Sequence, residues 1–319
     1  MTVAYIFPGQ GSQFAGMGRE LAERYAAARD VFAEVDDALG FSLSGLCFEG
    51  PEAALQLTEN TQPAILTVSI AVLRAMEAEG LPSPAFVAGH SLGEYSALVA
   101  AGALALKDAV RTVRARGLYM QEAVPVGVGA MAAILGADAE MVSEACREAA
   151  EGEVCSPANI NSPKQIVIAG HAGAVERAME MLKARGAKRA IKLPVSAPFH
   201  CELMQPARDR LASDLGQLEF ADLRAPLVCN VDAVAIRDVG EARSCLVRQV
   251  TSPVRWLESV QFLAGAGVET FVEVGPGKVL AGLVRQTLTG AHCLNVADPA
   301  SLEAARAALL QSEATGGGN

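Results

Sequence analysis

The fold is decided by the stretch Ala85-Phe86-Val87-Ala88-Gly89-His90-Ser91-Leu92-Gly93. Its first four residues are apolar and predict a short buried strand, and the residues after Gly93 predict a helix. The glycines between them match the pattern G-x-S-x-G, in which a tight strand-to-helix turn exposes a serine hydroxyl. Ser91 is therefore the candidate nucleophile, and the positive helix N-terminus beside it favours an oxyanion.

The same strand-then-helix order recurs towards both ends of the chain. Residues 3–7 form an apolar run closed by Pro8-Gly9-Gln10-Gly11-Ser12, and amphipathic or helical stretches follow at 16–39 and 64–79. Later strands are predicted at 227–231 and 270–274, with helices between them. Strands that alternate with helices indicate an α/β fold with a parallel sheet.

The middle of the chain has a different order of predicted strands and helices. After Pro125 we predict strands at 130–135, 154–159, 165–169 and 189–193, with helices at 139–150 and 174–185. This βαββαβ order is the ferredoxin-like pattern. We therefore expect residues 126–194 to form a ferredoxin-like subdomain, inserted into an α/β core made of residues 1–125 and 195–319.

Composition narrows the class of protein. The chain has 319 residues, of which 51% are hydrophobic and 19% charged, so it can bury an enzyme-sized core and is a poor candidate for disorder. Its net charge of −10 argues against nucleic acid or an anionic membrane as the main partner. Seven scattered cysteines, no basic leader and no long apolar run predict a cytoplasmic protein with reduced thiols.

A serine nucleophile needs a base, and the chain has four histidines. His90 adjoins the serine and should point across the turn, and His171 follows a small-domain strand, where a solvent-facing side chain is expected. His200 lies where the chain returns to the core, beside the cleft that two domains would form. His292 lies late in the chain, where an α/β-hydrolase keeps its base. The residues alone leave His200 and His292 as alternatives.

Other glycine-rich segments do not predict nucleotide or metal chemistry. The turn that follows the first strand fails the G-x-G-x-x-G pattern because Phe14 occupies the third glycine position. Gln10 in this turn is instead a candidate oxyanion-hole donor, together with the Leu92 amide. The segment around Lys278 lacks P-loop spacing, and no His or Cys set has the spacing of metal ligands, so no metal is expected.

Three arginines, Arg111, Arg114 and Arg116, lie on the helix predicted beyond the serine turn. Arginines on a helix usually form a solvated face. If one of them turned towards Ser91, its planar guanidinium would bind a carboxylate through two hydrogen bonds and select an acidic acyl group.

Together these residues resemble the malonyl-CoA:acyl-carrier-protein transacylases of bacterial type II fatty-acid synthesis. The resemblance runs in family order from residue 5 to about residue 285. Its segments are Phe7-Pro8-Gly9-Gln10-Gly11-Ser12-Gln13, Thr61-Gln62-Pro63-Ala64, Gly89-His90-Ser91-Leu92-Gly93-Glu94-Tyr95-Ser96-Ala97, Arg116-Gly117, Met120-Gln121-Glu122-Ala123-Val124-Pro125, Asn159-Ile160-Asn161-Ser162-Pro163, Pro198-Phe199-His200, Val247-Arg248-Gln249 and Glu273-Val274-Gly275-Pro276-Gly277-Lys278.

The resemblance implies a hydrolase-like α/β core with a ferredoxin-like subdomain, and it assigns roles to single residues. Ser91 is the implied nucleophile and His200 the implied base. Gln10 and the Leu92 amide form the implied oxyanion hole. Arg116 is the implied partner of the malonyl carboxylate, and Phe199 the implied contact with the extender unit. The supporting residues are Gln249, whose main-chain carbonyl would orient the histidine, Gln62 and Asn159.

The implied reaction is a ping-pong transfer of malonyl from malonyl-CoA, through a malonyl-serine, to holo-acyl carrier protein. It needs no cofactor, because the CoA thioester is a substrate. Two alternatives stay open: a stand-alone acyltransferase of a polyketide pathway, and a thioesterase or esterase that uses His292 with Asp232 or Asp238.

Carrier proteins are acidic as a class, so docking on a chain of net charge −10 requires a local basic cluster. We expect a monomer that docks its carrier near five basic residues of the subdomain: Lys183, Arg185, Lys188, Arg189 and Lys192.

Overall fold

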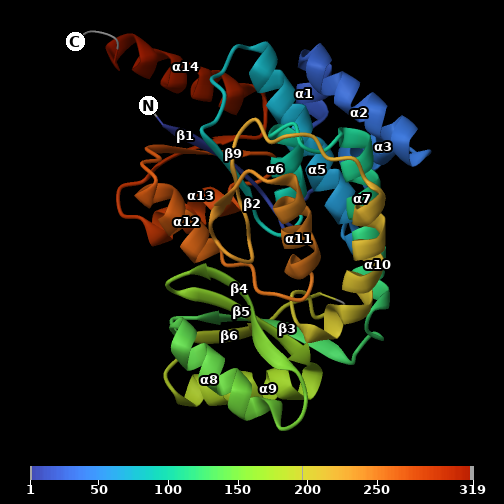
Figure 1. Cartoon of the computed structure of the whole chain (residues 1–319), viewed down its shortest axis with the longest axis vertical. Helices are drawn as coiled ribbons and strands as arrows, with labels where there is room; N and C mark the ends of the chain where they lie inside the picture. The colour runs from blue at the N-terminus through green and yellow to red at the C-terminus, as the bar shows by residue number, and fades with distance from the viewer. Residues whose placement is uncertain (1, 196, 317–319) are drawn as a thin grey trace.

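The computed structural model describes residues 2–195 and 197–316, with side chains up to residue 310. Residues 1, 196 and 317–319 of the predicted core lie outside this part. Figure 1 shows a larger lobe, built from the beginning and the end of the chain, and a smaller lobe, built from its middle. The predicted α/β class, with a largely parallel sheet and a separate antiparallel one, is confirmed.

The larger lobe is built on a six-stranded sheet in the order β10-β9-β1-β2-β7-β8. Every pair is parallel except β7 and β8, which are antiparallel because the short link between them cannot make a parallel crossover. The strands are β1 (Val3–Phe7), β2 (Phe86–Gly89), β7 (Leu227–Val228), β8 (Ala235–Ile236), β9 (Thr270–Val274) and β10 (His292–Val296).

Helices cover both faces of this sheet (Figure 1). None of the helices in the described ranges is both long enough and apolar enough to be a transmembrane segment. The helices are α1 (Arg19–Arg24), α2 (Ala26–Leu39), α3 (Leu43–Glu49), α4 (Glu52–Leu55), α5 (Thr58–Ala78), α6 (Gly93–Ala100), α7 (Leu106–Glu122), α10 (Gln205–Gln217), α11 (Val239–Gln249), α12 (Trp256–Gly265), α13 (Val279–Thr287) and α14 (Pro299–Gly316), with a 3-10 turn at Glu202–Met204.

Two helical predictions are corrected. The stretch 16–39 is not one helix, because Tyr25 is extended, with φ −115° and ψ 118°, and separates α1 from α2. The helix predicted at 64–79 begins earlier, at Thr58, and contains Pro63. Proline there removes one backbone donor, in a helix whose residues 61–73 are all buried.

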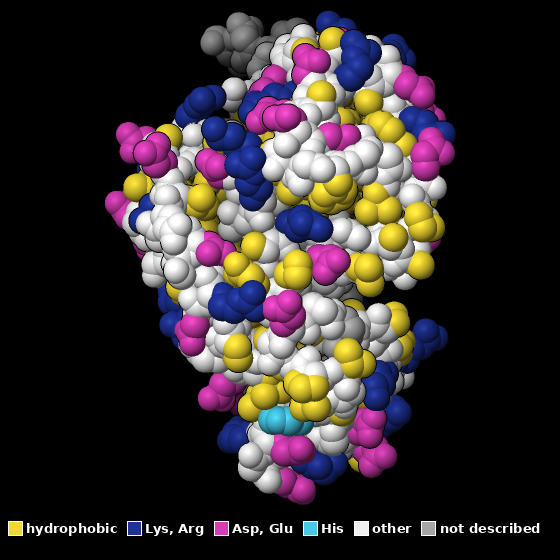
Figure 2. All heavy atoms as spheres, turned by 90° about the vertical axis from the view of Figure 1, so that its right-hand side faces the viewer, with side chains coloured by type: hydrophobic (Ala, Val, Ile, Leu, Met, Phe, Trp, Pro, Cys, Tyr) yellow, Lys and Arg dark blue, Asp and Glu magenta, His cyan; other side chains and the backbone are white. Residues whose placement is uncertain are grey.

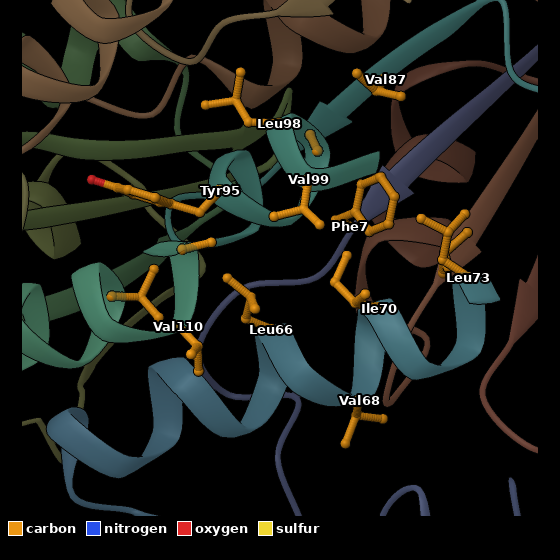
Figure 3. Close-up of a cluster of buried hydrophobic side chains, with 14 of the residues drawn as sticks. Phe7, Leu66, Val68, Ile70, Leu73, Val87, Tyr95, Leu98, Val99 and Val110 are labelled. Atoms are coloured by element: carbon orange, nitrogen blue, oxygen red, sulfur yellow. The ribbon is translucent and has the colours of Figure 1, made fainter. Parts of the chain in front are cut away.

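Helix α5 is the centre of the larger lobe, and every residue from 61 to 73 is buried. Figure 3 shows Leu66 and Ile70 directed towards Phe7 and α6, whereas Val68 points to the opposite side of the helix. Val68 there lies near Phe32 of α2, since a side chain on Gly18 would meet both. A helix buried on all faces is held firmly, and its first half carries Gln62.

The smaller lobe is a four-stranded antiparallel sheet in the order β4-β5-β3-β6. Its elements, in the predicted ferredoxin-like sequence, are β3 (Gly129–Leu135), α8 (Ala139–Ala150), β4 (Cys155–Ser162), β5 (Gln165–His171), α9 (Ala172–Ala184) and β6 (Arg189–Lys192). In Figure 1, α8 and α9 lie on the side of the sheet that faces away from the larger lobe.

The two lobes meet along β4. Asn159 forms a parallel bridge with Val254, and the amide of Ile160 donates to the Val254 carbonyl at 2.9 Å. Figure 2 shows the surface indented between the two lobes, with hydrophobic side chains on both sides of the indentation.

Candidate active site

The serine turn lies between β2 and α6. Ser91 has φ +53°, in the left-handed region that residues other than glycine seldom adopt. A side chain on Gly89 would come within 1.9 Å of the Gly93 carbonyl oxygen, and one on Gly93 within 2.2 Å of the Phe7 carbonyl oxygen. The turn therefore requires glycine at both positions, as G-x-S-x-G predicts.

Asn230, just beyond β7, fixes this turn from the side. Its Oδ1 accepts from the Ser91 amide at 2.8 Å, and its Nδ2 donates to the Gly89 carbonyl at 2.7 Å. We did not select Asn230 from the sequence, where it fell inside the strand predicted at 227–231. The available signal was a polar side chain at the carboxyl end of a strand, where α/β sheets place their sites.

His200 lies directly beside the serine. The Ser91 Oγ and His200 Nε2 are 2.7 Å apart, and His200 Nδ1 is 2.8 Å from the Gln249 carbonyl oxygen. A carbonyl only accepts, so Nδ1 carries the proton and Nε2 accepts from the serine hydroxyl. Burial, aided by the charge of Arg116, lowers the pKa of His200 to about 3, so the imidazole is neutral at physiological pH.

Arg116 of α7 reaches the same point and is only 2% exposed. Its Nη1 donates to Gln62 Oε1 at 2.7 Å, and its Nη2 donates to Gln249 Oε1 at 2.9 Å and to Ser91 Oγ at 3.1 Å. Burial lowers the pKa of this guanidinium. These three partners are uncharged, so the charge of Arg116 is free to attract an anion to the nucleophile.

A cavity of about 430 Å³ opens over these groups. Residues of the smaller lobe, among them Met131 and Leu193, line one side of it. The residues selected from the sequence that line it are Gln10, Gln62, Ser91, Leu92, Arg116, Asn159, Phe199 and His200. Gln249 lies behind them, fully buried.

Gln10, the candidate donor of the oxyanion hole, occupies the rim of this cavity. Its Nε2 donates to the Thr58 hydroxyl at 3.4 Å, at the beginning of α5. Leu92 follows the serine at the start of α6, so its amide belongs to the first turn of that helix. Both residues line the same cavity as Ser91.

The residues of the hydrolase alternative lie elsewhere. His292 is on the edge strand β10, exposed, with its Nδ1 3.0 Å from the Thr270 hydroxyl. Asp232 is held by two hydrogen bonds from Arg248, and Asp238 accepts from the Glu241 amide at the start of α11. The folded chain thus places His200, and not His292, within reach of the serine.

The remaining histidines have structural partners. His90 Nε2 is 2.8 Å from Asn161 Oδ1 of the smaller lobe. His171, expected to face solvent, is half-buried, and its Nδ1 accepts from the Val154 amide at 2.9 Å. The difference arises because His171 ends β5, where the backbone of residue 154 lies alongside it.

The other two arginines of α7 point away from the cavity. Arg111 donates to the Ala38 carbonyl at 2.8 Å. The Arg114 guanidinium lies 4.8 Å from the centre of the Phe41 ring. Of the three arginines singled out in the sequence, only Arg116 contacts the serine.

Comparison with known proteins gives one consistent result. A family model described as acyl transferase domain matches residues 4–311. The malonyl CoA-acyl carrier protein transacylase of Salmonella typhimurium is 52% identical over 305 residues, which are 95% of this chain and 98% of that protein. The protein of that name from Bacillus subtilis is 51% identical over 304 residues, 95% of this chain and 96% of that one.

Solved structures agree. A malonyl CoA-acyl carrier protein transacylase from Coxiella burnetii superposes with a TM-score of 0.95 at 44% identity, over 97% of this chain and 98% of that chain. A malonyl-transacylase solved in complex with its type II PKS acyl-carrier protein also gives a TM-score of 0.95, at 47% identity, over 97% of this chain and 100% of that one.

Proposed function

The chain belongs to the acyl transferase domain family, and on that premise we propose that it transfers malonyl from malonyl-CoA to the phosphopantetheine thiol of holo-acyl carrier protein. The transfer supplies extender units for fatty-acid synthesis. The observation that carries this proposal is the contact of Ser91 Oγ with both His200 Nε2, at 2.7 Å, and Arg116 Nη2, at 3.1 Å. A nucleophile, its base and a buried cation meet at one atom.

In the first half-reaction, Ser91 Oγ attacks the thioester carbonyl of malonyl-CoA while His200 Nε2 takes the hydroxyl proton. The oxyanion that forms is stabilised by the Leu92 amide and the side-chain amide of Gln10. The C–S bond then breaks, and CoA leaves as a thiol with the proton from His200. Malonyl remains as an ester on Ser91.

The second half-reaction reverses these roles. The phosphopantetheine thiol gives its proton to His200 and attacks the ester carbonyl. The C–O bond breaks, and Ser91 recovers the proton. The Gln249 carbonyl, 2.8 Å from His200 Nδ1, keeps the imidazole in the required tautomer without an acidic third residue.

Selectivity for malonyl follows from Arg116. Only one methylene separates the carbonyl under attack from the malonyl carboxylate, so a cation next to Ser91 Oγ lies within the required reach. Gln62 holds the guanidinium from the other side, at 2.7 Å. An acetyl group leaves this buried charge unpaired, which costs roughly 3–5 kcal/mol.

A second role has specific support. One similar structure holds a type II PKS acyl-carrier protein in complex with its malonyl-transacylase, at 47% identity to this chain. The same chemistry would serve a polyketide carrier without change to any residue named above. Rates of malonyl transfer to a fatty-acid carrier and to a polyketide carrier, measured side by side, distinguish the two roles.

We further propose that residues 126–194 act as one substrate-facing domain against a core of residues 1–125 and 195–319, and that one chain is the active unit. The carrier docks beside β6, whose chain continues into residues 193–195 at the cavity. Two of the five basic residues already form ion pairs: Arg185 with Glu148 and Lys192 with Glu176. Lys188 and Arg189 are exposed and are the better candidates for contact with an acidic carrier.

The docking proposal is tested with Lys188→Glu/Arg189→Glu and, as a control in the larger lobe, Lys107→Glu. At low salt the double variant should raise KM for the carrier about tenfold or more and leave KM for malonyl-CoA unchanged. The same carrier KM in all three proteins would reject this surface.

The reaction itself is tested by CoA release from malonyl-CoA with holo-carrier or apo-carrier as acceptor. With holo-carrier, release should continue through many turnovers, and with apo-carrier it should stop after about one equivalent per enzyme. Continued release with apo-carrier, together with free malonate, would identify a hydrolase instead.

A further inference from the structure

Among the residues that the structure describes, none forms an ion pair with Arg116. Its described hydrogen bonds go to Gln62, Gln249 and Ser91, all of them neutral. A buried guanidinium with neutral partners is costly unless a compensating charge lies nearby. The orientation of Arg116 therefore depends on the neutral groups that accept its hydrogen bonds.

Glu94 is a buried carboxylate that is connected to Arg116 through one of these groups, the Gln249 amide. It lies in the first turn of α6, three residues after the nucleophile, and is 0% exposed. Its Oε2 accepts from Gln249 Nε2 at 2.5 Å, and its Oε1 accepts from the backbone amide of Asn230 at 3.4 Å. The opposite end of the same Gln249 amide, Oε1, accepts from Arg116.

This arrangement determines which way the Gln249 amide faces. A carboxylate only accepts hydrogen bonds and a guanidinium only donates them. With Glu94 on one side and Arg116 on the other, the amide satisfies both in only one orientation. If the amide turned over, its NH₂ group would face the guanidinium and its oxygen would face the carboxylate.

We propose that Glu94 is a positioning residue for malonyl transfer: its carboxylate holds the Gln249 amide in the orientation that places Arg116 beside Ser91. This inference rests on the proposed function. It concerns Glu94, a residue that the chemistry of the reaction does not touch.

The same amide connects Glu94 to the rest of the site. Gln249 Nε2 also donates to the Ser91 carbonyl at 2.9 Å and to Asn230 Oδ1 at 3.1 Å. The backbone carbonyl of Gln249 holds His200. A change at Glu94 is therefore transmitted through one residue to the nucleophile, the base and the arginine.

The carboxylate is sensitive to pH in a useful range. Burial, with a smaller contribution from Cys229, raises the pKa of Glu94 to about 8, although the hydrogen bonds from Gln249 and Asn230 and the charge of Arg116 lower it. The other titratable groups that face it are Tyr95 of α6 and Cys245 of α11. Positioning by the carboxylate should therefore strengthen as pH rises through about 8.

The test measures serine loading, as the burst of CoA release, with malonyl-CoA and with acetyl-CoA between pH 6.5 and 9. This step needs no carrier protein. Glu94→Gln removes the charge at constant size, and Glu94→Asp keeps the charge on a shorter side chain. The control is Glu273→Gln, because Glu273 is equally buried but accepts from the Leu280 and Ala281 amides at the start of α13.

In the wild type and in Glu273→Gln, the preference for malonyl over acetyl should rise about tenfold as pH increases through 8. In Glu94→Gln, the preference for malonyl over acetyl should stay, at every pH, at the value that the wild type has at low pH. Glu94→Asp should show part of the rise seen in the wild type. A merely structural role would lower both substrates equally and leave the pH dependence intact.

A preference for malonyl over acetyl that is the same in Glu94→Gln and in the wild type at pH 9 would overturn the proposal. If Glu94→Gln does not fold, Glu94→Asp is the test variant, and its preference for malonyl over acetyl at pH 9 must lie below that of the wild type. A wild type that is never loaded by malonyl-CoA contradicts the proposed function itself, and this outcome is separate from the comparison of variants.

Discussion

Replacing Arg116 with alanine should change which acyl group the enzyme accepts. Arg116 is 2% exposed, so its interaction with a carboxylate is not weakened by solvent. The loss of a buried charge partner costs about 3–5 kcal/mol, and tenfold in rate corresponds to about 1.36 kcal/mol. The value of kcat/KM for malonyl-CoA should therefore fall roughly 150-fold to 5,000-fold.

Alanine also removes the donors to Ser91, Gln62 and Gln249. That loss affects malonyl and acetyl groups alike, so the ratio of the two kcat/KM values isolates the carboxylate interaction. The assay is the burst of CoA release with each thioester. The preference for malonyl should fall by about 100-fold or more.

Arg114→Ala is the matched control, since Arg114 lies on the same helix but packs over Phe41 outside the cavity. It should leave the preference unchanged. Equal losses for malonyl and acetyl in Arg116→Ala would refute the assignment of Arg116 as carboxylate partner.

Further predictions concern the base, the turn and the buried carboxylate. His200→Ala should abolish the burst of CoA release while His292→Ala retains it, and the opposite result would revive the hydrolase arrangement. The pH profile of loading should show no step near 6.5, the ordinary pKa of histidine, because the pKa of His200 is lowered to about 3; a step there that persists in Glu94→Gln would contradict this. Asn230→Ala removes the side-chain partners of the Ser91 amide and the Gly89 carbonyl. It should lower the free energy of unfolding, measured by urea denaturation, by about 2–6 kcal/mol. A loss below about 1 kcal/mol would contradict the role of this side chain. Because burial raises the pKa of Glu94 above its value in the unfolded chain, the wild type loses stability as pH rises from 4.5 to about 8. The melting temperature of Glu94→Gln should therefore rise relative to that of the wild type over this range. A difference in melting temperature that does not change with pH would contradict a buried, titrating Glu94.

Local patterns in the sequence predict the elements of the fold well. The strands at 3–7 and 270–274 and the helix at 139–150 have the predicted bounds. These segments combine a mostly apolar run or a clear helical period with a nearby glycine or a capping aspartate. The strand predicted at 227–231 was too long, because Asn230 leaves the sheet to bind the serine turn.

The site is harder to predict, because its parts are distant in sequence. Ser91 could be selected from the motif around it, but the choice between His200 and His292 required either a resemblance or the folded chain. Asn230 and Glu94 escaped selection because their partners lie 136 and 155 positions away, and no local pattern reports such pairs. Adjacent strands β2 and β7 bring them together.

The central claim is that malonyl passes through Ser91 to a carrier protein. The direct measurement is the intact mass of both proteins after incubation with malonyl-CoA and holo-acyl carrier protein, with Ser91→Ala as control. We predict a malonyl mass increase on the enzyme that passes to the carrier and is absent from Ser91→Ala. Free malonate with an unmodified carrier, or a malonylated Ser91→Ala protein, would contradict the account.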